Sequence, residues 1–97
     1  MNHKLSLKHH CIETEIKKRY NIALSEYFKG CGDPAEEIEA RIDIFKEALE
    51  TLDFGLLRSR HPELRGKSNA SVALYRDESG RLHITIDGKD IEPQIQI

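Results

Sequence analysis

The sequence lacks the features that mark several classes of protein. It has no tryptophan among its 97 residues, and its two cysteines, Cys11 and Cys31, are too few for a disulfide scaffold. No segment approaches the roughly 18 apolar residues of a membrane span, and the first twenty residues have no apolar core typical of a signal peptide. We therefore expect a cytoplasmic protein with no membrane partner.

Motifs of catalysis are missing as well. The sequence has no glycine-rich phosphate loop, no recognisable nucleophile motif and no paired-carboxylate motif. It also has no internal repeats and no low-complexity stretches. We expect a protein that is not an enzyme and that uses no cofactor.

Charge is nearly balanced overall but unevenly distributed. The chain has 15 Lys and Arg residues against 17 Asp and Glu residues, a formal net charge of -2. Residues 1–20 carry five bases and two acids, whereas residues 26–53 carry three bases and nine acids. Nucleic-acid-binding domains normally have a basic surplus, so we do not expect nucleic acid to be the main partner. The uneven distribution is compatible with self-association or a charged protein partner, although a solvated helix face is the simpler interpretation.

The first half of the chain predicts two amphipathic helices that form an antiparallel hairpin. Apolar residues from Ile12 to Phe28 recur at steps of three and four, which predicts a helix near residues 8–29. Asp33 and Pro34 form an N-terminal capping pattern, because the Asp33 carboxylate can accept hydrogen bonds from the first free N–H groups. The apolar stripe of the second helix consists of Ile38, Ile42, Phe45, Leu49 and Leu52.

Two shorter segments flank these helices. After the second helix we expect a short helical restart that is capped by Asp53 and stopped before Pro62. The opening stretch is compatible with two structures. Leu5 and Leu7 alternate as in a strand, whereas Ser6 can cap an early helix.

The last third of the chain predicts a three-stranded antiparallel meander. Residues 77–81, with Gly80 in a left-handed conformation, and the pair Asp87-Gly88 are both hairpin turn signals. Together the two turns align Leu74 with Ile84 and give the sheet one apolar face. That face consists of Val72, Leu74, Leu82, Ile84, Ile86, Ile91 and Ile95.

These elements predict an α+β protein with a single domain over residues 1–97. An antiparallel helical hairpin, about residues 8–59, is expected to pack on a three-stranded antiparallel β-meander, about residues 70–97, in the order ααβββ. A chain of this length builds one modest core, and so thin a sheet leaves two open edges. Pairing with a second copy would protect them.

The predicted register brings three polar side chains together. Tyr75, His83 and Glu92 fall side by side in a row across the strands, on the face opposite the apolar one. A histidine between a phenol and a carboxylate is a candidate proton carrier or ligand-binding group. An exposed sheet face normally carries polar neighbours of this kind, which is the simpler interpretation, and a covered face would indicate a contact surface.

A possible metal-binding group lies near the beginning of the sequence. His9, His10 and Cys11 are of the residue types that zinc prefers as ligands. Cys31 lies 20 residues beyond Cys11, or roughly 30 Å along a helix, so one chain cannot easily bring both thiols to one ion. A site built from two copies would avoid this objection, and the simpler interpretation is a polar segment with two inert thiols.

A basic segment follows the expected helical restart. Arg58, Arg60, Arg65 and Lys67 surround His61-Pro62-Glu63. Grouped arginines can bind phosphates or carboxylates through paired hydrogen bonds, so these four residues are candidate contacts for an anion or a nucleic acid. The simpler interpretation is a solvated loop paired to acidic neighbours.

The sequence thus favours a small, non-enzymatic, cytoplasmic protein-binding or regulatory module. Its expected partners are another protein and itself, as a homodimer whose helical hairpins pack together. Two alternatives are a metal- or ligand-binding module that uses His9, His10 and Cys11, and a nucleic-acid accessory protein that uses the segment from Arg58 to Lys67.

Overall fold

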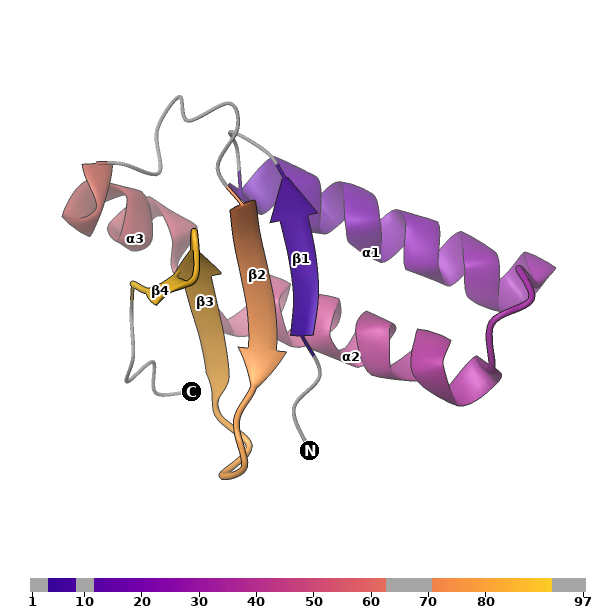
Figure 1. The fold of residues 1–97 in the computed structure, drawn as a ribbon. Coiled ribbons are helices and arrows are strands. Elements are labelled where there is room, and N and C mark those ends of the chain that lie inside the picture. Colours follow the sequence, from indigo (N-terminus) through magenta and orange to yellow (C-terminus); the bar gives the residue numbers. More distant parts are fainter. Residues whose placement is uncertain (1–3, 9–11, 63–70, 92–97) are drawn as a thin grey trace.

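The computed structural model of the chain describes residues 4–8, 12–62 and 71–91. Within these ranges, four antiparallel strands form one sheet in the order β1-β2-β3-β4, and three helices cover one face of it (Figure 1). The elements are β1 (Lys4–Lys8), α1 (Ile12–Lys29), α2 (Ala35–Thr51), α3 (Phe54–Arg60), β2 (Ser71–Arg76), β3 (Leu82–Ile86) and β4 (Lys89–Asp90). The expected α+β class and the hairpin of α1 and α2 are confirmed.

The sheet has four strands rather than the three expected. β1 pairs antiparallel with β2, and this pairing places Leu5 opposite Leu74 and Leu7 opposite Val72. The element order is therefore βαααβββ, and α1 begins at Ile12 rather than near residue 8. Of the two structures compatible with the opening stretch, the strand is the one found, because the alternating leucines reach the apolar face of the sheet.

The start of α2 differs from the expected cap. Pro34 occupies the N-cap position, with φ −59° and ψ 140°, and its carbonyl accepts from the backbone N–H groups of Glu37 and Ile38. Asp33 lies one residue too early to cap the helix, and its carboxylate instead accepts a hydrogen bond of 3.0 Å from Arg41. The capping pattern predicted the helix correctly but placed its first residue one position too early.

The expected cap of the helical restart is confirmed. The Asp53 carboxylate accepts from the backbone N–H of Leu56 at 2.9 Å, which satisfies a free donor of the first turn of α3. The helix ends at Arg60, immediately before the His61-Pro62 pair that disfavours further helix.

The two glycine turns hold the register as expected. Gly80 and Gly88 have φ values of 85° and 83°, a region that residues with a Cβ rarely adopt. The first turn pairs Leu74 with Ile84, and the second pairs Ile86 with Lys89. The expected face position of Ile95 lies outside the described residues.

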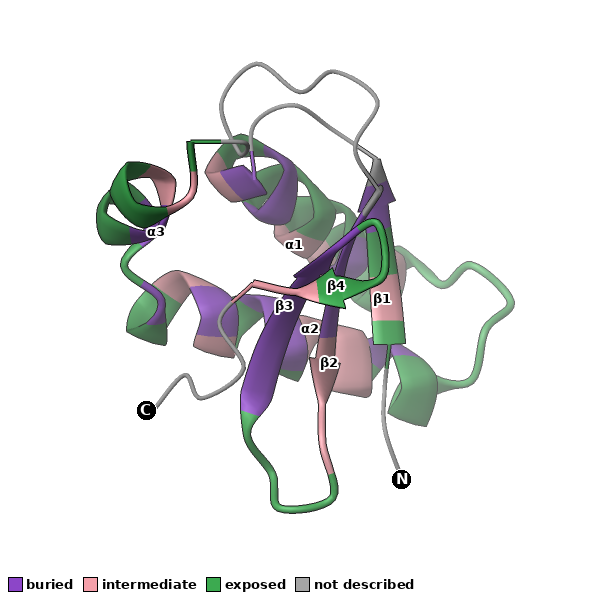
Figure 2. Ribbon diagram, turned by 60° about the vertical axis from the view of Figure 1, so that its left-hand side comes forward, coloured by how far each residue is buried: buried purple, intermediate pink, exposed green. Residues whose placement is uncertain are grey.

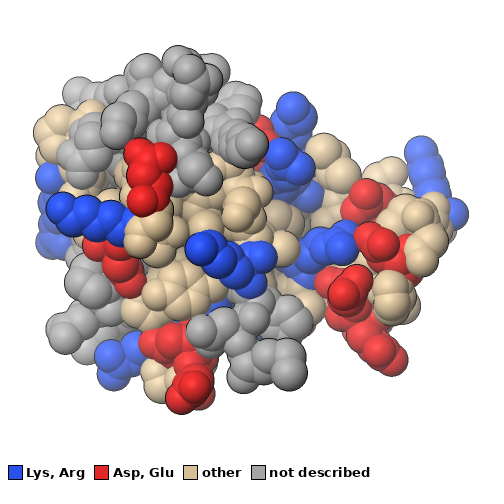
Figure 3. All heavy atoms as spheres, in the orientation of Figure 1, with Lys and Arg blue, Asp and Glu red and all other residues tan. Residues whose placement is uncertain are grey.

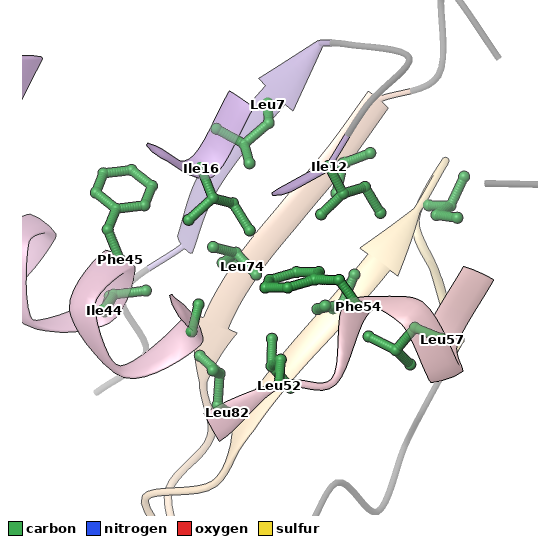
Figure 4. Close-up of a cluster of buried hydrophobic side chains, with 14 of the residues drawn as sticks. Leu7, Ile12, Ile16, Ile44, Phe45, Leu52, Phe54, Leu57, Leu74 and Leu82 are labelled. Atoms are coloured by element: carbon green, nitrogen blue, oxygen red, sulfur yellow. The ribbon is translucent and has the colours of Figure 1, made fainter. Parts of the chain in front are cut away.

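The core lies between the helices and the apolar face of the sheet (Figure 4). Ile16, Leu74 and Ile84 are fully buried, and Phe54 and Leu57 bring α3 into the same cluster. The apolar stripe of α1 does not stay buried along its length, however, because the hairpin extends beyond β1 (Figures 1 and 2). Tyr27 and Phe28, at the far end of α1, are exposed.

The face of the sheet opposite the helices is more buried than its sequence indicates. Ala73, His83 and Thr85 point to this face and are each less than 8% exposed. Figure 2 shows β3 buried along its whole length. The interpretation of the polar row as part of an ordinary exposed face is therefore wrong for His83.

No helix within the described residues is long and apolar enough to cross a membrane.

Candidate functional site

Two carboxylates hold the imidazole of His83 from opposite sides. Its Nε2 lies 2.7 Å from Asp77 Oδ2, and its Nδ1 lies 2.8 Å from Asp90 Oδ2. The ring is nearly inaccessible, since the side chain of His83 is 8% exposed, against 32% for Asp77. We call Asp77, His83, Asp90 and the adjacent Tyr75 the histidine cluster.

The hairpin turns bring these residues together. Asp77 follows β2 and Asp90 lies in β4, so each carboxylate is a diagonal neighbour of His83 across a strand pair. Asp77 also accepts from the Ser79 hydroxyl at 2.7 Å and from the backbone N–H of Arg81 at 3.0 Å. The same carboxylate therefore closes the turn and binds the imidazole.

Tyr75 covers one side of the imidazole. Its ring stacks on His83 with centroids 4.9 Å apart and planes 12° from parallel. The Tyr75 hydroxyl donates to Asp90 Oδ2 at a long distance of 3.4 Å. Phenol, imidazole and carboxylate thus form one contact group on the face opposite the helices.

The environment of the cluster changes two pKa values. Hydrogen bonds to the Asp77 carboxylate, from the Ser79 hydroxyl first and then from His83 and the Arg81 backbone, lower its pKa far below the usual range. Burial raises the pKa of Tyr75, and the charge of Asp90 and its hydrogen bond add to the increase. The cluster therefore favours an ionised Asp77 beside a neutral Tyr75.

This arrangement restricts the chemistry of His83. An ionised carboxylate can only accept a hydrogen bond. The contacts of His83 with Asp77 and Asp90 are therefore both hydrogen bonds only when both ring nitrogens carry a proton. With both nitrogens occupied, the ring has no remaining nitrogen for a substrate. The two carboxylates also lie on opposite sides of the ring and do not converge on one ion, and among the described residues no group of three His, Cys, Asp or Glu side chains could hold a metal.

An open pocket of about 300 Å³ lies beside the cluster. Lys4, Tyr75, Thr85 and Gly88 line it. The pocket reaches Tyr75 but not the nitrogens of His83, which both carboxylates occupy.

The polar row predicted from the sequence is found in part. Tyr75 and His83 are direct cross-strand partners, as expected. Glu92, the expected third member, lies outside the described residues. The carboxylates that bind His83 are Asp77 and Asp90, which sequence reasoning missed because it considered direct neighbours across the strands and not diagonal ones.

The structure describes two of the four candidate anion-binding residues. Arg58 lies 3.6 Å from Glu13, an acidic residue in the first turn of α1. Arg60 is exposed at the end of α3. Arg65 and Lys67 lie outside the described residues, as do all three candidate metal ligands, His9, His10 and Cys11.

A second candidate site lies where the hairpin extends beyond the sheet. We call it the edge groove: a hollow of about 220 Å³ between residues 5–7 of β1 and the helix residues Ile22, Ala23 and Phe45. Ser6 is exposed on the strand side and Ile22 is 41% exposed on the helix side. Sequence reasoning missed this groove. The alternation of Leu5 and Leu7 indicated a strand, but nothing in the sequence indicated that this strand would lie beside α1 and α2 at the edge of the sheet.

Charged side chains surround the apolar lining of the edge groove. Arg19, Glu26 and Arg41 contribute to it. Arg19 donates from Nε to Glu15 at 2.6 Å, and Arg41 lies within 4 Å of Glu26. Acidic side chains gather farther along the hairpin, where α2 begins (Figure 3).

Comparison with known proteins places the chain in a family. A protein-family model matches residues 1–88, which is most of the chain. The chain belongs to this family. An uncharacterized protein of Archaeoglobus fulgidus is 41% identical over 57 residues, which cover 58% of this chain and 67% of that protein. No solved structure matches the chain.

Proposed function

We propose that this protein is a non-enzymatic, protein-binding module that forms a homodimer through its helical hairpin. The observation that carries the proposal is the exposure of large apolar side chains at the end of α1. Phe28 is 80% exposed and Tyr27 is 42% exposed. Their rings meet edge to face, with centroids 5.5 Å apart, and so present one joined aromatic surface to solvent.

A second copy of the chain could bury this surface. Grouped exposed apolar residues mark interaction sites more often than isolated ones do. Because the hairpin extends beyond the sheet, packing two hairpins together would bury both aromatic pairs without disturbing either core (Figure 1).

The histidine cluster supports a non-enzymatic function. Both nitrogens of the buried His83 are held by carboxylates, so this histidine is poorly placed to exchange protons with a substrate. The cluster instead ties the turn after β2 to β4, which is a structural role.

Sedimentation equilibrium over a range of protein concentrations tests the dimer. We expect a reversible monomer–dimer equilibrium that Phe28→Glu shifts to monomer, because a buried apolar contact is replaced by a charge. The matched control is Leu56→Glu, which changes an apolar side chain on α3 that is 46% exposed and should leave the equilibrium unchanged. A wild-type protein that remains monomeric at the highest concentration would refute the homodimer.

A further inference from the structure

Among the described strands, β1 lies at the outer edge of the sheet. β1 pairs with β2 on one side, and within the described part of the chain no strand pairs with its other side. In an edge strand, alternate N–H and C=O groups point away from the sheet and are available to a further strand. Ser6, at the middle of β1, is exposed.

The helical hairpin extends over the space beside this edge. α1 and α2 continue past β1, so a fifth strand beside β1 would lie beneath them (Figures 1 and 2). Ile22, Ala23 and Phe45 line the edge groove from the helix side. Every second side chain of an added strand points to the same face, so these side chains would meet Ile22 and the aliphatic parts of the charged residues that also line the groove.

Charge at the edge disfavours a second copy as the added strand. An antiparallel pairing of two β1 strands about Ser6 would place Lys4 of one copy opposite Lys8 of the other, at both ends. Like charges directly opposite each other destabilise a strand pair. Acidic residues in the same two positions would instead be attracted.

We propose that the β1 edge binds one extended segment of a partner protein as a fifth strand, in which two acidic residues flank apolar residues at alternate positions. The acidic residues take the register positions opposite residues 4 and 8 of β1, and the apolar side chains enter the edge groove against Ile22, which is 41% exposed. This proposal rests on the proposed protein-binding function but does not require the homodimer, because neither Tyr27 nor Phe28 lines the groove.

Short peptides test the proposal on the full-length protein. The probe is a capped peptide with the core Glu-Val-Thr-Val-Glu. Its binding is followed by the amide hydrogen exchange and the amide chemical shifts of residues 4–8. We expect saturable binding that slows exchange of the outward N–H groups of β1. The same peptide N-methylated on alternate residues should not bind, because it keeps its side chains but loses the donors of strand pairing.

Variants locate the binding site. Ile22→Asn should weaken binding about tenfold, since it replaces an apolar wall of the groove. Leu56→Asn, the matched control on α3, should bind as the wild type does. Phe28→Glu should also retain binding, which separates failure of this proposal from failure of the homodimer.

The proposal would be overturned by a lack of β1 protection at the highest soluble peptide concentration or by equal binding of the N-methylated peptide. Equal binding of a Lys-Val-Thr-Val-Lys core, or unchanged affinity in Ile22→Asn, would overturn it too. Protection of β1 that rises with protein concentration without peptide would also overturn it, because the occupant would then be a second copy.

Discussion

The ring of Tyr75 lies almost parallel to the imidazole of His83, with 4.9 Å between their centroids. Because the two residues are direct cross-strand partners, the stack joins β2 to β3 on the face opposite the helices. Asp90 contacts both rings, at 2.8 Å from His83 Nδ1 and 3.4 Å from the Tyr75 hydroxyl, so the stack also reaches β4. The histidine cluster therefore links three of the four strands.

Replacing His83 should destabilise the sheet. His83→Leu leaves the Asp77 and Asp90 carboxylates without the imidazole that both contact, and we expect a loss of about 2 kcal/mol in the free energy of unfolding. Urea denaturation measures this loss. The double variant His83→Leu/Asp90→Asn should lose less than the sum of the single variants, because they share one interaction. Strict additivity would show that the His83–Asp90 contact contributes nothing.

Acid should destabilise the protein partly through Asp77. In the folded state the lowered pKa keeps this carboxylate ionised. In the unfolded chain it takes up a proton at about pH 3.9. Its contribution is therefore complete above that pH and is lost as the pH falls toward the lower folded pKa. Asp77→Asn should flatten the decline of stability below about pH 4, measured by denaturation at several pH values. The control, Asp43→Asn on an exposed face of α2, should retain the wild-type slope.

Tyr75 should titrate above the ordinary range for tyrosine. Burial and the neighbouring Asp90 raise its pKa, so the unfolded chain loses the phenolic proton first and stability falls as the pH rises past about 10. Ultraviolet difference titration measures the ionisation, with Tyr75→Phe identifying its share of the signal. Asp90→Asn should lower the pKa of Tyr75, because it removes the charge while keeping a similar shape. An unchanged titration in that variant would exclude the Asp90 contribution.

The two candidate caps should differ in their effect on stability. Asp53→Ala removes the bond to the Leu56 N–H and should cost about 1 kcal/mol. Asp33→Ala removes only the exposed ion pair with Arg41, which is expected to contribute less than about 1 kcal/mol. Thermal denaturation of both variants compares them directly. A larger effect at Asp33 would restore it as the cap of α2.

Much of the fold was predictable because its signals are local. The turn at Gly80 and the turn at Gly88 each fix a register within a few residues, and the alternation of Leu74 and Ile84 then determines which face is apolar. Asp53 likewise predicts a helix start through a bond to a residue three positions away. These features depend on neighbouring residues alone.

Only those contacts of the candidate site that follow directly from strand register were predictable from the sequence. The sequence places Tyr75 beside His83, because strand pairing makes them direct neighbours. It does not show that Asp77 and Asp90 take the two ring nitrogens, since diagonal contacts depend on twist and on side-chain rotamers. Nor does it show that His83 is buried on a face whose residues alternate as in an exposed sheet.

The sequence by itself determined the helices, the two glycine turns and the alignment of β2 with β3, because each is set by contacts between residues close together in the chain. Tertiary structure alone decided that β1 joins the sheet beside β2, across more than sixty residues of intervening sequence, and that the hairpin of α1 and α2 extends past it. A short alternating segment has no local preference for one distant partner strand. Burial of Leu5 and Leu7 against the shared core makes that choice, and the same choice places β1 at the edge of the described sheet, beside the groove.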